Sequence, residues 1–211
     1  MLLYLICYIG LWTATLIMTL TIFRFKVGSL KWQVGLAALT MAPVSTLIHY
    51  HAFSFLTILQ VVCYTVLLMV FFKVNVGYAA LMAVTGFFLS GLPDLFTDWY
   101  YEKVLGIQVV NTIAQVSAII VFDLAIAWFF LKFRLGFSFI PQHKKMGRPD
   151  IKTASFKGMF ISLALAGVIA VIGALYVTSE AGQKNILAVL FSTSMILSVL
   201  FRLYYVKELE D

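Results

Sequence analysis

Charged residues are scarce in this chain, and their scarcity excludes an ordinary soluble domain. Only 11% of the 211 residues are Asp, Glu, Lys or Arg, whereas 63% are hydrophobic. A soluble domain carries about 25% charged and about 45–50% apolar residues. So few charges could not cover the surface of a globule that has this much apolar material to hide. The sequence therefore predicts that lipid surrounds most of the chain.

Cysteine is rare as well. The two cysteines, Cys7 and Cys63, both lie inside apolar runs. A disulfide framework needs an even set of cysteines in a small extracellular domain, which this chain does not resemble. We interpret both residues as buried free thiols that pack like small hydrophobic side chains.

Motifs for catalysis and cofactor binding are missing. The sequence contains no GxGxxG, P-loop, HExxH, CxxC or GxSxG pattern. His49 and His51 would lie on opposite sides of a helix, so they are interpreted as interfacial polar residues rather than metal ligands. We therefore expect no catalytic residue, no metal and no cofactor in this chain.

Long apolar runs are abundant, and each is near the length of about 20 residues that crosses a bilayer. The sequence predicts an all-α, polytopic transmembrane helix bundle of about seven spans in a single domain. The second span is the weakest, because it is short and contains Pro43, so a kinked or re-entrant helix is an alternative there. The predicted spans are 2–23, 33–50, 53–72, 75–93, 108–131, 158–178 and 185–206.

The basic residues divide unequally between the two sides of these spans. If the N-terminus faces outward, the outer segments hold only Lys103 and Lys184, and the other thirteen Lys and Arg residues fall on the inner side. Cytoplasmic segments carry such an excess of Lys and Arg. The net charge of +6 thus reflects membrane topology, not nucleic-acid binding. We expect a multi-pass protein of the bacterial cytoplasmic membrane whose C-terminus is cytoplasmic.

A basic cytoplasmic loop is predicted at 132–157, where seven of the fifteen basic residues are found. One interpretation is topology together with attraction to anionic lipid, worth about 1 kcal/mol per basic residue near the surface. The alternative is a docking surface for a cytoplasmic partner. The residues expected to meet anionic lipid are Lys144, Lys145, Arg148 and Lys152.

Asp123 is the single acid inside a predicted span. A charge at that depth is costly and normally faces the bundle interior or a polar cavity. Asn111 and Gln115 fall within about 120° of Asp123 on the helical wheel, so the fifth span carries one polar stripe. Asp123 is either a carboxyl that bonds a neighbouring helix or part of a ligand pocket. Gln60 in the third span and Thr85 in the fourth are candidate partners for it.

An outer loop is predicted from Pro93 to Lys103. It combines acids with aromatic residues, which is typical of an aromatic belt at the membrane surface; the alternative is an external site for a cationic or amphipathic ligand. The candidate ligand-binding residues there are Asp94, Asp98, Trp99 and Glu102.

The chain resembles the membrane sensor of Agr-type peptide quorum-sensing histidine kinases. The resemblance rests on the span pattern and on three short segments, Phe72-Lys73-Val74, 132–141 (KFRLGFSFIP) and 203–210 (LYYVKELE). It implies that the outer half of the bundle senses a secreted peptide or an envelope perturbation. It also implies that the last helix rotates to control an attached dimeric kinase.

The chain departs from that family in having no phosphoacceptor-His helix and no ATP-binding domain, since His143 lies in the basic loop. The resemblance therefore covers the sensor part alone, without enzyme activity. Our first hypothesis is a sensor or regulatory module of a two-component system. It would bind a peptide or small molecule, contact a cytoplasmic kinase or regulator, and form a homodimer.

Two further hypotheses remain. The second is a small-solute binding or transport subunit with a polar intramembrane site around Asp123. The third, with the least support, is an embedded cysteine peptidase that pairs Cys63 with His51. These residues are twelve positions apart, which places Cys63 about 15 Å or more into the next span.

Overall fold

The computed structural model describes residues 2–51, 55–103, 113–138 and 186–210, and these residues are helical apart from short connections. No strand occurs within those ranges. The helices are α1 (Leu2–Ile22), α2 (Lys31–His51), α3 (Phe55–Phe72), α4 (Val76–Lys103), α5 (Ile113–Lys132) and α8 (Ile186–Glu210), with a 3₁₀ turn, η1, at Val27–Ser29.

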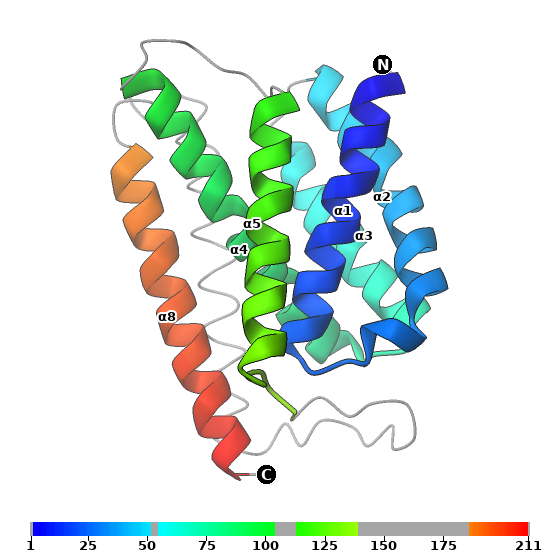
Figure 1. Ribbon diagram of the computed structural model, residues 1–211, viewed down its shortest axis with the longest axis vertical. Coiled ribbons are helices and arrows are strands. Elements are labelled where there is room, and N and C mark those ends of the chain that lie inside the picture. The colour runs from blue at the N-terminus through cyan, green and yellow to red at the C-terminus, as the bar shows by residue number, and fades with distance from the viewer. Residues whose placement is uncertain (1, 52–54, 104–112, 139–185, 211) are drawn as a thin grey trace.

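Consecutive helices from α1 to α5 run in alternating directions (Figure 1). The short connections 23–30 and 73–75 therefore lie at the same end of the bundle. The helix α8 runs in the same direction as α5 and ends near the C-terminus at that end (Figure 1). This up-and-down arrangement agrees with the alternation that the sequence predicts for its first five spans.

Three of the described helices are long and apolar enough to cross a membrane, at Leu3–Ile22, Val76–Tyr101 and Ile113–Lys132. Shorter apolar stretches lie at Leu59–Phe72 and Thr193–Val206. An all-helical chain with such helices is compatible with a membrane protein. The predicted span 158–178 and most of the loop 132–157, including Lys144, Lys145, Arg148 and Lys152, lie outside the described residues.

The second predicted span lies within a single helix. Residues 33–50 do lie in one helix, α2, which continues through Pro43. Proline removes one backbone donor but does not prevent a helix when its neighbours pack around it. The described part of α2 is not among the helices that qualify by length and hydropathy.

The predicted outer loop from Pro93 to Lys103 is wrong, because these residues form the last turns of α4. Pro93 sits inside the helix with the fixed φ that an α-helix requires and costs it one hydrogen bond. The Thr97 hydroxyl donates to the carbonyl oxygens of Pro93 and Asp94 at 2.8 Å each, which adds local bonds around the proline. The charged residues in this segment thus mark the end of the apolar part of α4, while the helix itself continues.

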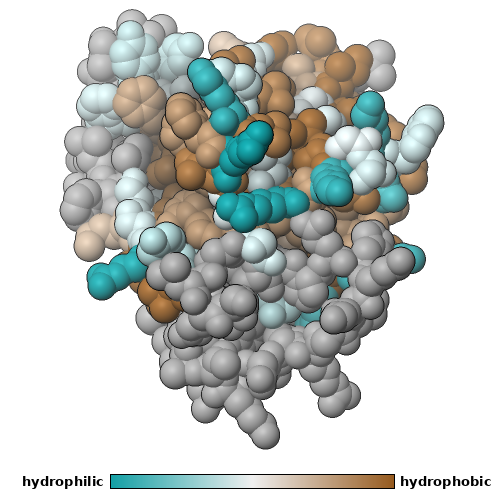
Figure 2. Space-filling view, turned by 60° about the horizontal axis from the view of Figure 1, so that its bottom comes forward, coloured by the Kyte–Doolittle hydropathy of each residue, from teal (hydrophilic) through white to brown (hydrophobic). Residues whose placement is uncertain are grey.

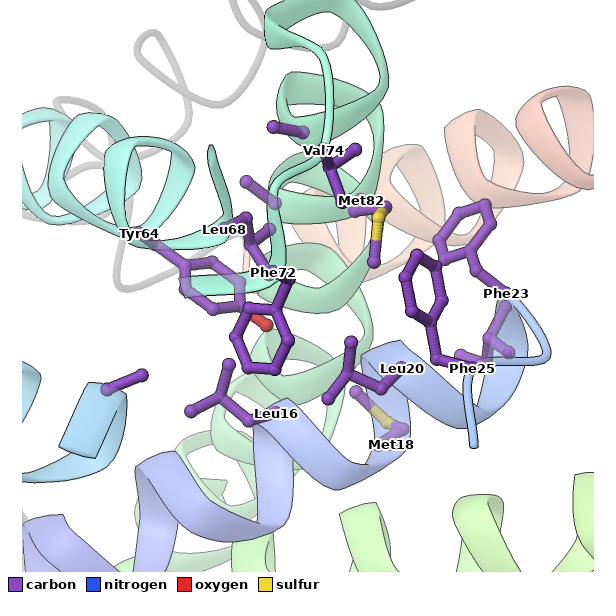
Figure 3. Packing of buried hydrophobic residues seen from close by; sticks show 14 of the residues in the cluster. Leu16, Met18, Leu20, Phe23, Phe25, Tyr64, Leu68, Phe72, Val74 and Met82 are labelled. Atoms are coloured by element: carbon purple, nitrogen blue, oxygen red, sulfur yellow. The ribbon is translucent and has the colours of Figure 1, made fainter. Parts of the chain in front are cut away.

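The helix α1 is the central element of the bundle. It packs against α2, α4 and α5, and from Ala14 to Phe23 only Ile17 is partly exposed. Figure 3 shows Leu16 and Leu20 of α1 beside Tyr64 and Phe72 of α3. A helix that is hydrophobic on every face is expected at the centre of a bundle, because all of its faces must then be covered by other helices.

Three helices end in a basic residue with left-handed backbone conformation. These are Arg24 after α1 (φ 54°), Lys73 after α3 (φ 53°) and Arg134 after α5 (φ 52°). At Arg24 and Arg134 the backbone bonds of a Schellman motif close the helix, for example from Phe25 N to the Leu20 oxygen at 2.9 Å. A cation at a helix C-terminus also interacts favourably with the helix dipole.

These ends support one another. The Phe137 amide after α5 donates to the Ile22 carbonyl at the end of α1 (2.8 Å), and Arg24 Nη2 donates to the Arg134 carbonyl (3.3 Å). Gly136 between them has φ 128°, and a Cβ there would lie 2.7 Å from the Ile22 oxygen. Glycine is therefore required at this position for α1 and α5 to end side by side.

Close approach of α4 to α1 depends on Gly86. A Cβ built at Gly86 would collide with Oγ1 of Thr19, whose hydroxyl accepts a hydrogen bond from Tyr64 at 2.9 Å. We expect Gly86→Ala to lower the free energy of unfolding by about 1–3 kcal/mol, because the added methyl group overpacks this contact. Thermal unfolding in detergent micelles measures the change.

Gly91, on the same helix, provides the matched control. A Cβ at Gly91 meets nothing within 4 Å, so Gly91→Ala should be neutral or stabilising by up to about 1 kcal/mol through helix propensity. Adding Thr19→Ala to Gly86→Ala should recover part of the loss. Equal effects of the two glycine substitutions would contradict the role assigned to Gly86.

Candidate functional site

Short polar side chains on α4 connect this helix to three others. Ser90 and Asp94 are one turn apart and point to the same side, whereas Thr85 lies about 140° from Ser90 around the helix. Ser90 and Asp94 contact α5, Ser90 also contacts Thr15 of α1, and Thr85 contacts α8. The helix α4 is thus bonded to both sides of the bundle.

The carboxyl group of Asp123 lies at a junction of α1, α4 and α5. Its Oδ2 atom accepts hydrogen bonds from the hydroxyls of Thr15 and Ser90, both at 2.7 Å, and the two hydroxyl oxygens are 3.2 Å apart. Asp123 is 0% exposed. Among the described residues its Oδ1 atom has no hydrogen-bond partner. The carboxyl is therefore enclosed by packed helices and does not line an open pocket.

The second polar contact between α4 and α5 is nearer the end of the bundle that holds the N-terminus. Gln115 Nε2 donates to Asp94 Oδ1 at 2.6 Å, and Gln115 is 2% exposed. Gln115 precedes Asp123 by eight residues, or about 12 Å along α5. The predicted polar stripe of the fifth span is confirmed for these two side chains, and Asn111 lies outside the described residues.

Thr85 and Tyr204 connect α4 to α8. Their hydroxyl oxygens are 2.6 Å apart, and both side chains are fully buried. The Tyr204 ring also meets Phe23 at 5.6 Å, Phe137 at 5.2 Å and Phe201 at 6.2 Å between centroids. This aromatic cluster joins the end of α1, the segment after α5 and α8 at one place.

A separate polar network joins α1, α2 and α3. The Ser45 hydroxyl accepts from Trp12 Nε1 at 2.6 Å and from Gln60 Nε2 at 2.8 Å. The expectation that Gln60 and Thr85 bond to Asp123 is wrong, since Gln60 bonds Ser45 and Thr85 bonds Tyr204. Position along a span does not tell which helices are neighbours, and α3 is separated from α5 by α1 and α4.

The candidate ligand-binding residues predicted between Pro93 and Lys103 do not form one described cluster. Trp99 is partly buried against Phe96, with ring centroids 5.9 Å apart, while Asp94 bonds Gln115. Asp98 and Glu102 lie on α4, but their side chains are outside the described set. The same holds for the side chains of His49 and His51, so the pairing of His51 with Cys63 stays a hypothesis.

Sequence reasoning missed Thr15, Ser90 and Tyr204. One signal was present for the first two, because a short hydroxyl side chain in an apolar span is a donor that needs an acceptor. It does not identify the acceptor, since Ser and Thr also bond to their own helix, as Thr85 does to Leu81 oxygen at 2.7 Å.

The described side chains show what the arrangement can do chemically. Within the described ranges no three His, Cys, Asp or Glu residues come together as metal ligands. The polar contacts hold helices in register, and Asp123 is fully buried among them. They are suited to coupling helix positions more than to chemistry on a substrate.

Searches for similar proteins found no match to a family model, a curated protein or a solved structure.

Replacing Asp123 should separate its role as acceptor from its charge. Asp123→Ala leaves the Thr15 and Ser90 hydroxyls without their acceptor, and we expect it to cost about 1–3 kcal/mol of stability. Asp123→Asn keeps an acceptor oxygen and should cost less than half as much. Ser117→Ala, an exposed hydroxyl on the same helix that bonds only Ile113 oxygen, is the control. An Asn variant as unstable as the Ala variant would show that the anionic charge itself is needed.

Proposed function

We propose that this protein is a membrane-embedded sensor or regulatory module that passes a signal through α8 to a cytoplasmic partner. The observation that carries the proposal is the position of α4. It bonds α5 through Asp94 and Ser90, and it bonds α8 through Thr85. From Asp94 to Thr85 this helix spans about 14 Å. A change at its outer end therefore has a direct mechanical route to α8.

The attachment of α8 favours movement at its inner end. Of the described helices, α8 packs chiefly on α4, whereas α1 is held by three helices. The Tyr204 hydroxyl of α8 lies 2.6 Å from the Thr85 hydroxyl of α4. After Tyr204 the helix continues to Glu210, past the basic ends of α1, α3 and α5. A small shift of α4 would thus change the direction in which the last turns of α8 leave the bundle.

The proposed orientation places the N-terminus outside and the C-terminus in the cytoplasm. Arg24, Lys73, Lys132, Arg134 and Arg202 belong to the end of the bundle where α1, α3, α5 and α8 finish (Figure 1). Figure 2 looks toward this end and shows hydrophilic side chains over a largely hydrophobic surface. Such an excess of basic residues is typical of the cytoplasmic side.

The partner would be a histidine kinase or another regulator, and the signal a peptide or small molecule, as in the family that the sequence resembles. A homodimer belongs to the same proposal. A small-solute site around Asp123 has less support, because that carboxyl is enclosed and bonded to two hydroxyls. The described groove beside α5 is apolar.

Orientation can be tested by labelling single cysteines in cells. In a Cys7→Ser, Cys63→Ser background, Ser29→Cys lies in η1 at the basic end and Ile113→Cys at the start of α5, and both sites are exposed. We expect a membrane-impermeant maleimide to label Ile113→Cys in intact cells and Ser29→Cys only after permeabilisation. The reverse pattern would invert the proposed topology, and labelling of both in intact cells would show that α2, α3 and α4 do not all cross the membrane.

Transmission can be tested by measuring the distance between spin labels on α4 and α8. Labels at Val76 and Val206 report the inner ends of the two helices, since both positions are exposed. In lipid vesicles we expect Gln115→Ala, which breaks the bond to Asp94, to shift or broaden this distance. Adding Tyr204→Phe should remove the response, because it deletes the hydroxyl next to Thr85 and keeps the ring.

Tyr205→Phe is the matched control, as Tyr205 is the next residue and is 61% exposed. It should leave the response to Gln115→Ala intact. If Gln115→Ala leaves the label distance unchanged, the proposed route through α4 fails. If Tyr205→Phe and Tyr204→Phe act alike, the Thr85–Tyr204 contact is not the coupling point.

A further inference from the structure

A groove of about 440 Å³ lies between α4, α5 and α8. Its volume falls within the range of about 300–1,000 Å³ that is usual for ligand sites. Seven apolar residues line it: Leu89, Phe122, Ala125, Ile126, Phe129, Phe130 and Phe201.

The groove is open on the side of α5, where Phe122 is 38% and Phe129 is 46% exposed. Its wall offers no hydrogen-bonding side chain, so a polar solute would lose its hydration there without compensation. A hydrocarbon chain loses nothing by entering. The composition of the wall therefore selects an acyl chain.

A cation lies at the inner end of this groove. Lys132 follows Ala125 by seven residues and Phe129 by three, which places it below them on the same face of α5. Its Nζ atom is 4.6 Å from the centre of the Trp128 ring. Lys132 is exposed and has no acidic partner among the described side chains.

Among the described side chains at this end of the bundle, the charged ones are basic. Arg134 and Arg202 are also exposed at this end; Arg202 directly follows Phe201, and Arg134 comes four residues after Phe130. The two described acidic side chains, Asp94 and Asp123, are bonded to Gln115 and to the Thr15 and Ser90 hydroxyls, away from this end. An anionic group is thus attracted to the point at which the apolar groove meets water.

We propose that this groove binds one anionic phospholipid of the inner leaflet, with an acyl chain against Phe122, Ala125 and Phe129 and the phosphate at Lys132. The Trp128–Lys132 pair marks the headgroup level, where indole and ammonium groups are enriched. The proposal requires a bilayer around the chain but no signalling role. Its failure and that of the proposed function are therefore distinguishable.

The test is native mass spectrometry of the full chain in detergent micelles, titrated with phosphatidylglycerol or with zwitterionic phosphatidylcholine of the same acyl chains. We expect one phosphatidylglycerol to be retained with about fivefold preference, the ratio that corresponds to about 1 kcal/mol for one basic residue near an anionic group. Lys132→Gln should abolish the preference. Ala125→Phe, which fills the groove, should weaken retention of both lipids.

Two controls match these variants. Lys26→Gln removes the same charge from an exposed site beside η1, and Val121→Phe adds bulk at a 67% exposed position of α5 that does not line the groove. Both should bind as the unmodified chain does. Equal retention of the two lipids by the unmodified chain would overturn the proposal, and so would an equal loss in Lys26→Gln and Lys132→Gln. Retention by Ala125→Phe equal to that of the unmodified chain would show that the groove plays no part.

Discussion

The carboxyl group of Asp123 needs hydrogen-bond donors, and in this protein the donors come from two other helices. Thr15 on α1 and Ser90 on α4 both reach its Oδ2 atom at 2.7 Å. An apolar interior provides no water to replace them, and an acid placed there without partners costs several kcal/mol. Apolar side chains can pack in many registers, but two donors and one acceptor meet in only one. The register of α1, α4 and α5 therefore depends on this junction.

The helix α4 connects that junction to the rest of the bundle through contacts on two of its sides. Gly86 lets it approach α1 so closely that Thr19 occupies the space of a missing Cβ. On its other side Thr85 holds Tyr204 of α8, within a cluster of aromatic rings. A helix bonded on both sides cannot shift at one without straining the other. This property makes α4 the connection between the Asp94–Gln115 contact and α8.

The two ends of the bundle differ in chemistry, and this difference organises the proposed functions. At one end Asp94 and Gln115 are bonded beside the aromatic pair of Phe96 and Trp99. At the other, Arg24 and Arg134 close their helices in left-handed conformation and add positive charge where the helix dipoles are negative. Signal input at the first end and lipid and partner contacts at the second are consistent with this division.

Within the described residues, the sequence by itself predicted the helices α1 to α5 and α8 and the alternating directions of the first five. Long apolar runs predict helices, because an uncovered backbone is as costly in hydrocarbon as in a protein core. The periodicity of the helix also placed Gln115 and Asp123 on one face. It did not show that α4 continues through Pro93, because proline is excluded from a helix only when its lost hydrogen bond is not offset.

Tertiary structure alone decided which polar groups meet. The sequence marks Gln60, Thr85 and Asp123 as side chains that need partners, yet their partners are Ser45, Tyr204 and the pair Thr15 and Ser90. The partner of each side chain depends on which helices pack together and at what depth. The sequence does not show this, because an apolar helix has a similar surface on every side. The packing of small against large residues, such as Gly86 against Thr19, decides which helices are neighbours. Such packing joins residues that are far apart in the chain.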